Sequence, residues 1–234
     1  MINVTHFDDL GTFANDWLDA HYHFSFAGYH DPAKMGLGPL RVWNDDTIRA
    51  GTGFDPHPHR DMEIVTYVRT GAISHQDSLG NKGRTAAGDV QVMHAGTGIV
   101  HAEMNLEEED TTLFQIWIMP DKAGHVPGWD ARQFPKDPVT DALPALASGR
   151  DEHPDAMRIH QNASVHGGRI NAGDSVRHDL GHGRAAYLVV SEGAVEVNGT
   201  FVDTRAGATI RDEDSLMIKA LEDAEIVLVD VALS

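Results

Sequence analysis

The chain has 234 residues, of which 41% are hydrophobic, enough for one large or two ordinary domains with a real core. It contains no cysteine, which excludes disulfides, thiolate metal ligands and cysteine nucleophiles. The formal net charge is −18 and the basic residues are scattered, which argues against direct nucleic-acid binding, because phosphate contacts need clustered positive charge. Neither a positively charged leader nor an apolar run of membrane-spanning length is found, so we expect a soluble cytoplasmic protein without membrane contact.

Strand-like alternation dominates the chain, and helical signals are few. Runs with this pattern occupy 62–68, 90–93, 112–119, 185–190, 194–197 and 225–231. Short strands at this spacing, separated by turn residues, predict an all-β barrel or sandwich. The proline-rich stretch 121–155 changes character and predicts a connector with a short helical turn near 143–148.

Two short segments carry candidate metal ligands. In HPH at 57–59 and HAE at 101–103, two metal-binding side chains lie two residues apart in a strand-like sequence. Side chains two apart on a strand share a face, so neighbouring strands can bring three imidazoles and one carboxylate to one point. Such a set suits a mononuclear transition-metal site with open positions for water, substrate or oxygen. Glu63 has the same parity as His57 and His59, so spacing alone leaves it as an alternative carboxylate ligand.

The surroundings of these segments resemble the two cupin motifs. Gly51, the HPH segment, Glu63 and Gly71 have the spacing of the first motif, and the second appears as GTGIVHAEMN. Over about residues 10–120 the chain resembles the pirin family of two-barrel cupins, in HYHFSFAGYHDPAKMGLGPLRVWNDD, GFDPHPHRDMEIVTYVRTGAISHQDSLGNKG and GDVQVMHAGTGIVHAEMN. This resemblance implies that the metal ligands are His57, His59, His101 and Glu103, rather than Glu63. His94 departs from the pirin pattern, which commonly has threonine there, and is either a tolerated substitution or an additional polar group near the site.

An internal repeat supports two barrels. Gly71 and Gly193 lie in similar segments 122 residues apart, and Gly88 and Gly207 lie 119 residues apart. These offsets carry the four ligand positions to Asp179, Gly181, Ala220 and Glu222, so we expect the second copy to lack a metal site. We interpret the nearby His178 and His182 as surface residues. The prediction is an all-β fold of two cupin domains: a metal-binding cupin at 1–125, a connector at 126–155 and a second cupin without a metal site at 156–234.

For bacterial pirins, the resemblance implies a metal-dependent quercetinase, which opens the central ring of a flavonol with O2 and releases carbon monoxide. One divalent transition metal is implied, with iron expected first and nickel, copper, manganese, zinc or cobalt as alternatives. Glu103 would either stay bound to the ion or take the proton of the flavonol 3-hydroxyl as general base. An aromatic substrate also needs an apolar pocket. The candidate pocket residues, whose alternative interpretation is ordinary hydrophobic core, are Phe24, Phe26, Met35 and Leu37.

Two other functions stay open at this point. Some pirins are metal-dependent or redox-dependent partners of other proteins, so the resemblance also implies a regulatory module without flavonol turnover. A third possibility is a purely structural metal, although a cupin barrel does not need a metal to close. The acidic charge disfavours DNA contact and says nothing against a protein partner.

Overall fold

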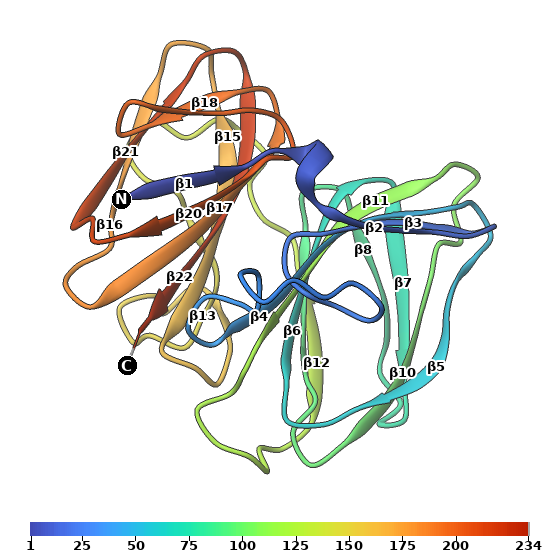
Figure 1. The fold of residues 1–234 in the computed structure, drawn as a ribbon. Coiled ribbons are helices and arrows are strands. Elements are labelled where there is room, and N and C mark those ends of the chain that lie inside the picture. Colours follow the sequence, from blue (N-terminus) through green and yellow to red (C-terminus); the bar gives the residue numbers. More distant parts are fainter. Residues whose placement is uncertain (234) are drawn as a thin grey trace.

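The computed structural model describes residues 1–233, and nearly all of their regular structure is strand. The helical element is a short 3-10 helix, η1 (Phe7–Asp9). The strands form two barrels that lie side by side, one running from blue to green and the other from yellow to red (Figure 1). Each barrel combines a seven-stranded and a four-stranded sheet. The predicted all-β fold with two barrels in one chain is confirmed.

The first barrel carries the HPH and HAE segments. Its seven-stranded sheet has the order β12-β9-β6-β11-β4-β3-β2, and its four-stranded sheet has the order β5-β10-β7-β8. In chain order the strands are β2 (Gly11–Ala14), β3 (Leu18–Tyr22), β4 (Leu40–Ile48), β5 (Gly53–His59), β6 (Glu63–Thr70), β7 (Ala72–Asp77), β8 (Lys82–Ala86), β9 (Val90–His94), β10 (Ile99–Met104), β11 (Thr111–Ile118) and β12 (Gly128–Arg132).

The second barrel takes its first strand from the beginning of the chain. Its sheets have the orders β1-β20-β17-β22-β15-β13-β14 and β16-β21-β18-β19. Figure 1 shows β1, in dark blue, alongside β20. The strands are β1 (Ile2–Thr5), β13 (Ala145–Ser148), β14 (Met157–Arg158), β15 (Ala163–Ile170), β16 (Ser175–Asp179), β17 (Arg184–Glu192), β18 (Val195–Val197), β19 (Thr200–Val202), β20 (Gly207–Arg211), β21 (Ser215–Ala220) and β22 (Ala224–Ala232).

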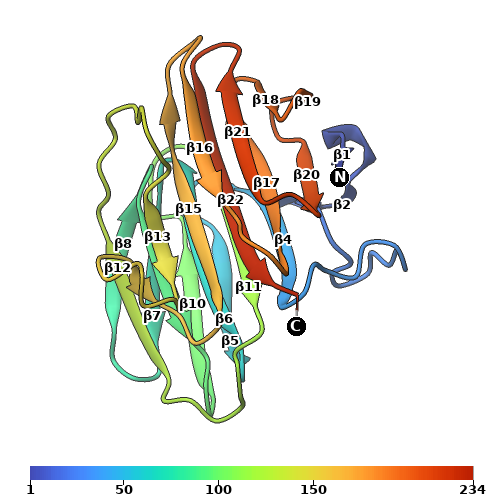
Figure 2. The same cartoon turned by 90° about the vertical axis from the view of Figure 1, so that its left-hand side faces the viewer.

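One apolar core joins the two barrels. It contains side chains from both seven-stranded sheets, including Trp43 and Phe114 of the first barrel and Tyr187 of the second. Figure 2 shows β15 and β22 in front of strands of the first barrel. Along β6, Val65 faces this shared core while Ile64 faces the interior of its own barrel, as the period of two requires. The seven-stranded sheet of the first barrel therefore has two apolar faces, one toward the interior of its own barrel and one toward the second barrel.

The proline-rich stretch is not structureless. β12 pairs with β9 of the first barrel and β13 pairs with β15 of the second, so the predicted connector 126–155 contributes a strand to each. The predicted helical turn near 143–148 is wrong, because Ala145–Ser148 is a strand held in the second sheet. The boundaries after residues 125 and 155 stay a prediction. Within residues 1–233, no helix has the length and apolar character needed to cross a membrane.

One of the two repeated glycine pairs, Gly71 and Gly193, has the same backbone role in both barrels. Gly71 has a φ of 71° and Gly193 a φ of 76°, in the left-handed region that favours glycine. A Cβ at Gly71 would lie 2.5 Å from Thr111 Oγ1, and one at Gly193 would lie 2.3 Å from the Asp223 carbonyl oxygen. Close packing and conformation both require glycine at these turns, which explains why the repeat shows there.

Candidate metal centre

Strands β5 and β10 bring three histidines to one point inside the first barrel. They pair antiparallel, with His57 opposite His101 and His59 opposite Ile99. The ring centroids of His57, His59 and His101 are separated by 4.5 to 4.9 Å, and one nitrogen from each ring lies within 4.8 Å of the others. Pro58 can stand between the two ligand positions of β5 because this strand is at the edge of its sheet.

The electronic state of these rings fits a metal ion. Both ring nitrogens of His101 are buried and find no hydrogen-bond partner among residues 1–233. Burial, followed by the neighbouring His57, lowers the pKa of His59 to about 4, and the same causes lower the pKa of His101 to about 2. His57 donates from Nδ1 to the Asp55 carbonyl oxygen at 2.7 Å, which leaves Nε2 as the nitrogen with a free lone pair. Neutral imidazoles with available lone pairs are the form that binds iron, nickel, copper or zinc.

Glu103 lies beside this cluster, fully inside the barrel. Its carboxylate forms a second group with His101 and His75, whose ligand atoms also lie within 4.8 Å of one another. Gln91 Nε2 donates to Oε1 at 2.5 Å and Gln115 Nε2 donates to Oε2 at 2.8 Å. Burial raises the pKa of Glu103 to about 7, although a hydrogen bond from Gln91 opposes the rise. The two groups share His101, and the four-ligand set with Glu103 stays a prediction.

His75 is a neighbour that sequence reasoning missed. It lies on β7 directly opposite Glu103, and its Nε2 is 3.0 Å from Asp77 Oδ2. Its ring stacks on Trp129 at 4.7 Å between centroids, with an interplanar angle of 8°. His75 and Asp77 have the same two-residue spacing as His101 and Glu103, and this spacing was the signal available in the sequence.

Glu63 points away from the three histidines. The chain leaves the four-stranded sheet after His59, passes Asp61 with a φ of 47°, and enters the seven-stranded sheet at Glu63. The alternation of side-chain direction along β5 therefore does not continue into β6. Glu63 faces the second barrel, where it contacts His94 at 2.6 Å and His160 at 3.2 Å. Burial alone would raise the pKa of Glu63, but the hydrogen bond and charge of His94 lower it overall. His94 therefore lies on the far side of the sheet from the barrel interior and does not line the cavity beside the three histidines.

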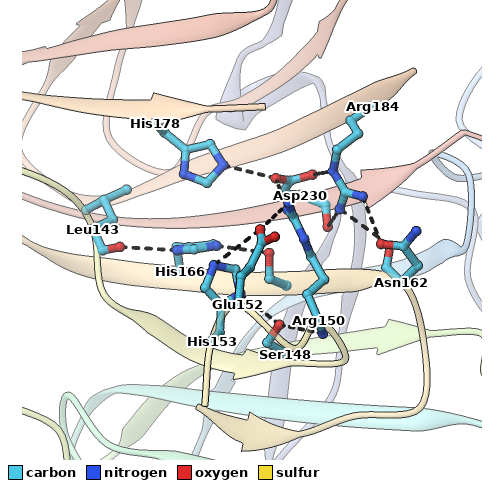
Figure 3. A network of polar contacts seen from close by, with 11 residues as sticks. Leu143, Ser148, Arg150, Glu152, His153, Asn162, His166, His178, Arg184 and Asp230 are labelled. Atoms are coloured by element: carbon cyan, nitrogen blue, oxygen red, sulfur yellow. Dashed lines mark hydrogen bonds and ion pairs between the residues drawn. The ribbon is translucent and has the colours of Figure 1, made fainter. Parts of the chain in front are cut away.

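The second barrel contains a polar network around Asp230 (Figure 3). His178 is buried, and its Nε2 lies 3.2 Å from Asp230 Oδ2, so its interpretation as a surface residue is wrong; His182 is exposed, as expected. Arg184 and Arg150 hold the same carboxylate at 2.6 and 3.0 Å. Within residues 1–233, no group of three potential metal ligands is composed of second-barrel strands alone.

A cavity of about 180 Å³ opens onto His57 and His59. The pocket wall is mostly apolar and includes Leu18, Ala20, Tyr22, Phe26, Phe54 and Trp117. Of the four residues selected from the sequence, Phe26 lines this cavity. Phe24 and Leu37 belong instead to the core between the barrels, and Met35 is 39% exposed.

Three polar side chains also reach the cavity: Asn44, Asp46 and Gln115. The Oδ1 atoms of Asn44 and Asp46 are buried and have no hydrogen-bond partner among residues 1–233. Burial, followed by the nearby charges of Asp45 and Glu103, raises the pKa of Asp46 well above its usual range. Burial therefore favours the protonated form of Asp46, in which the carboxyl group can both donate and accept a hydrogen bond.

Several known proteins are similar to this chain in sequence and fold. The Pirin family model matches residues 4–118, and the model of the quercetinase C-terminal cupin domain matches residues 145–231. A pirin-like protein of Caulobacter vibrioides is 55% identical over 99% of this chain and 100% of its own length. A quercetin 2,3-dioxygenase of Escherichia coli is 39% identical over 99% of both chains. The crystal structure of the bacterial pirin YhhW from Escherichia coli in complex with nickel(II) has a TM-score of 0.92 and 38% identity, covering 100% of both chains. The chain belongs to the pirin family and consists of two cupin domains.

Proposed function

We propose that this chain is a metal-dependent dioxygenase of the quercetinase type, which opens the central ring of flavonols with O2. The observation that carries the proposal is the convergence of three imidazoles, two of which, His57 and His59, line a mostly apolar cavity. The similarity to a quercetin 2,3-dioxygenase of Escherichia coli supports the substrate class. Fold alone would not, because cupins host many chemistries.

A divalent transition metal would be held by His57, His59 and His101, with Glu103 as the fourth ligand. When bound, such an ion acts as a Lewis acid toward a chelating hydroxyl and carbonyl and brings dioxygen chemistry to the site. The nickel complex of the Escherichia coli pirin supports a divalent ion in this type of barrel. Iron is the proposed native metal, with nickel, copper, manganese, zinc and cobalt as alternatives for the assay.

The cavity sets how a flavonol would bind. Pockets that enclose a drug-sized ligand have roughly 300 Å³ or more, so a cavity of about 180 Å³ takes only part of a flavonol and leaves the rest at its mouth. The edges of Phe26 and Trp117, whose rings meet at 84°, would contact the inserted ring system. Asn44 and Asp46 would then supply hydrogen bonds to substrate hydroxyl or carbonyl groups, satisfying oxygens that otherwise have no partner.

Glu103 has two alternative roles in this proposal: it stays bound to the ion as the fourth ligand, or it accepts the proton of the flavonol 3-hydroxyl. With a pKa of about 7 in the metal-free chain, its carboxylate can take up a proton near neutral pH, as a general base requires. Gln115 both lines the cavity and donates to Glu103, so the carboxylate lies directly behind the cavity wall. When Glu103 acts as the base, the proton of the flavonol 3-hydroxyl moves to one of its oxygens, and Gln91 and Gln115, which donate to Oε1 and Oε2 respectively, hold the carboxylate in place.

The test is oxygen uptake with a panel of flavonols. Chelator-treated protein is reloaded separately with Fe(II), Ni(II), Cu(II), Mn(II), Co(II) or Zn(II), and oxygen consumption is compared with loss of flavonol absorbance. We expect metal-dependent uptake with quercetin that the chelator abolishes. Failure with every metal, while the ion is demonstrably bound, would favour the regulatory alternative, in which a protein partner binds the metal-loaded chain. The proposed location is the cytoplasm.

A further inference from the structure

A second cluster of metal-binding side chains lies between the two barrels. One ligand atom from each of Glu63, His94 and His160 lies within 4.8 Å of the other two. We propose that these three residues form a second divalent-metal site, separate from the histidines inside the first barrel. Two imidazoles and one carboxylate favour zinc as the bound ion, and divalent iron or cobalt can bind the same ligands.

The fold explains why these residues meet. Glu63 begins β6 and His94 ends β9, and the two are directly opposite in the antiparallel ladder. Both belong to the sheet face that packs against the second barrel, as Val65 of β6 and Val92 of β9 do. His160 follows β14 and comes from the second-barrel side. The cluster therefore takes two residues from one barrel and the third from the segment that leads into the other.

The distances are close to those of a tetrahedral ion. Glu63 Oε2 lies 2.6 Å from His94 Nδ1, and Glu63 Oε1 lies 3.2 Å from His160 Nδ1. With metal–ligand bonds of 2.0–2.2 Å, neighbouring ligand atoms of a tetrahedral site are separated by about 3.3 Å. The contact to His160 already has this length, and the contact to His94 needs to open by roughly 0.7 Å. Because the two rings contact different oxygens of Glu63, the carboxylate would also turn to present one oxygen to the ion. Each ring that now donates from Nδ1 would carry its proton on Nε2 instead, so that Nδ1 can exchange its hydrogen bond for a bond to the metal.

The cluster faces solvent on one side. The side chains of His94 and His160 are 17% and 29% exposed, whereas Glu63 is 1% exposed, so the site has a buried carboxylate and a solvent-facing side. His125 stacks on His160 at 3.9 Å between centroids and contacts Asp121 at 2.6 Å, which fixes the orientation of the His160 ring. Two imidazoles and one carboxylate with an open position match the ligand sets of zinc and non-haem iron sites.

The experiment measures zinc binding with the first site disabled. In the chain carrying His57→Ala and His101→Ala, calorimetric titration with zinc should find one ion per chain and a zinc-dependent rise in Tm. Adding His94→Ala or His160→Ala should weaken that binding by at least about tenfold, because even the loss of a residue that only orients a ligand typically costs 10–100-fold. His182→Ala is the matched control, since His182 is an exposed histidine outside the cluster and should leave binding unchanged.

A second arm uses chains that keep the first site. Wild type should bind two zinc ions, and the variant with His94→Ala and His160→Ala should bind one, with the flavonol assay reporting the first site separately. If the chain with a disabled first site binds no zinc, or if His94→Ala and His182→Ala have equal effects, the proposed site is wrong and the cluster is a hydrogen-bonded contact between the barrels. Neither result would depend on whether the first site turns over a flavonol.

Discussion

Replacing Glu103 with glutamine should change the stability of the metal-free protein in a pH-dependent way. The unfolded chain ionises this carboxyl from about pH 4.5 upward, whereas burial raises the pKa of the folded form to about 7. Wild type therefore loses stability as pH rises from about 4.5 to 7, at about 1.4 kcal/mol per pH unit, and reaches a cost of about 3 kcal/mol above pH 7. Glu103→Gln lacks this cost. The free energy of unfolding of the variant, relative to that of wild type, should therefore increase by about 2–3 kcal/mol from pH 5 to pH 8.

The assay is urea unfolding of chelator-treated wild type and variant at both pH values, followed by tryptophan fluorescence. Comparing the two pH values cancels the pH-independent effect of placing an amide beside Gln91 and Gln115. Adding Fe(II) or Ni(II) should make wild type more stable than Glu103→Gln. An amide is a poorer ligand than a carboxylate, so metal binding should raise the free energy of unfolding of the variant by less. A stability difference that is the same at pH 5 and pH 8 would refute the reasoning about burial, and equal metal affinity would remove Glu103 from the ligand set.

Three further predictions concern other residues. His101→Ala should strip the metal from the first barrel at neutral pH, as measured by metal analysis after dialysis, while the exposed His182→Ala retains it; full occupancy in His101→Ala would exclude this ligand. Burial lowers the pKa of His166 to about 3, so this ring lowers stability by about 1.4 kcal/mol per pH unit as pH falls below 6.5, where the unfolded chain takes up a proton first. His166→Gln should flatten that part of the stability profile in urea unfolding, and an unchanged slope between pH 6.5 and 5 would contradict it. Asp46→Leu should raise KM for quercetin by roughly tenfold or more without changing metal content, because the substrate loses a hydrogen bond in the cavity; an unchanged KM would place the flavonol elsewhere.

Local sequence patterns predicted several strands and the convergence of His57, His59 and His101 on one point. The runs at 62–68 and 112–119 correspond to β6 and β11 to within two residues, since alternation directly reports a sheet with two different faces. His57, His59 and His101 come together because a period of two fixes their side-chain direction and the barrel pairs β5 with β10. Both inferences need only the geometry of strands and their immediate neighbours.

Features that depend on the path between strands could not be read from the sequence. Glu63 has the parity of His59, yet the chain changes sheets between them, and this crossing sends Glu63 to His94 and His160. His178 looked like a surface residue because its partner Asp230 lies 52 residues further along the chain. Burial of a polar residue depends on such distant partners, which no local spacing encodes.

The most direct measurement of the central claim is the stoichiometry of the reaction. Quercetin loss, oxygen uptake and carbon monoxide release should be followed together for the metal-loaded wild type and for His57→Ala. We expect one oxygen molecule to be consumed and one carbon monoxide to be released per quercetin lost for wild type, and no change in any of the three for His57→Ala. Ring opening by His57→Ala that lacks bound metal, or a metal-loaded wild type that binds quercetin without releasing carbon monoxide, would contradict the proposed function.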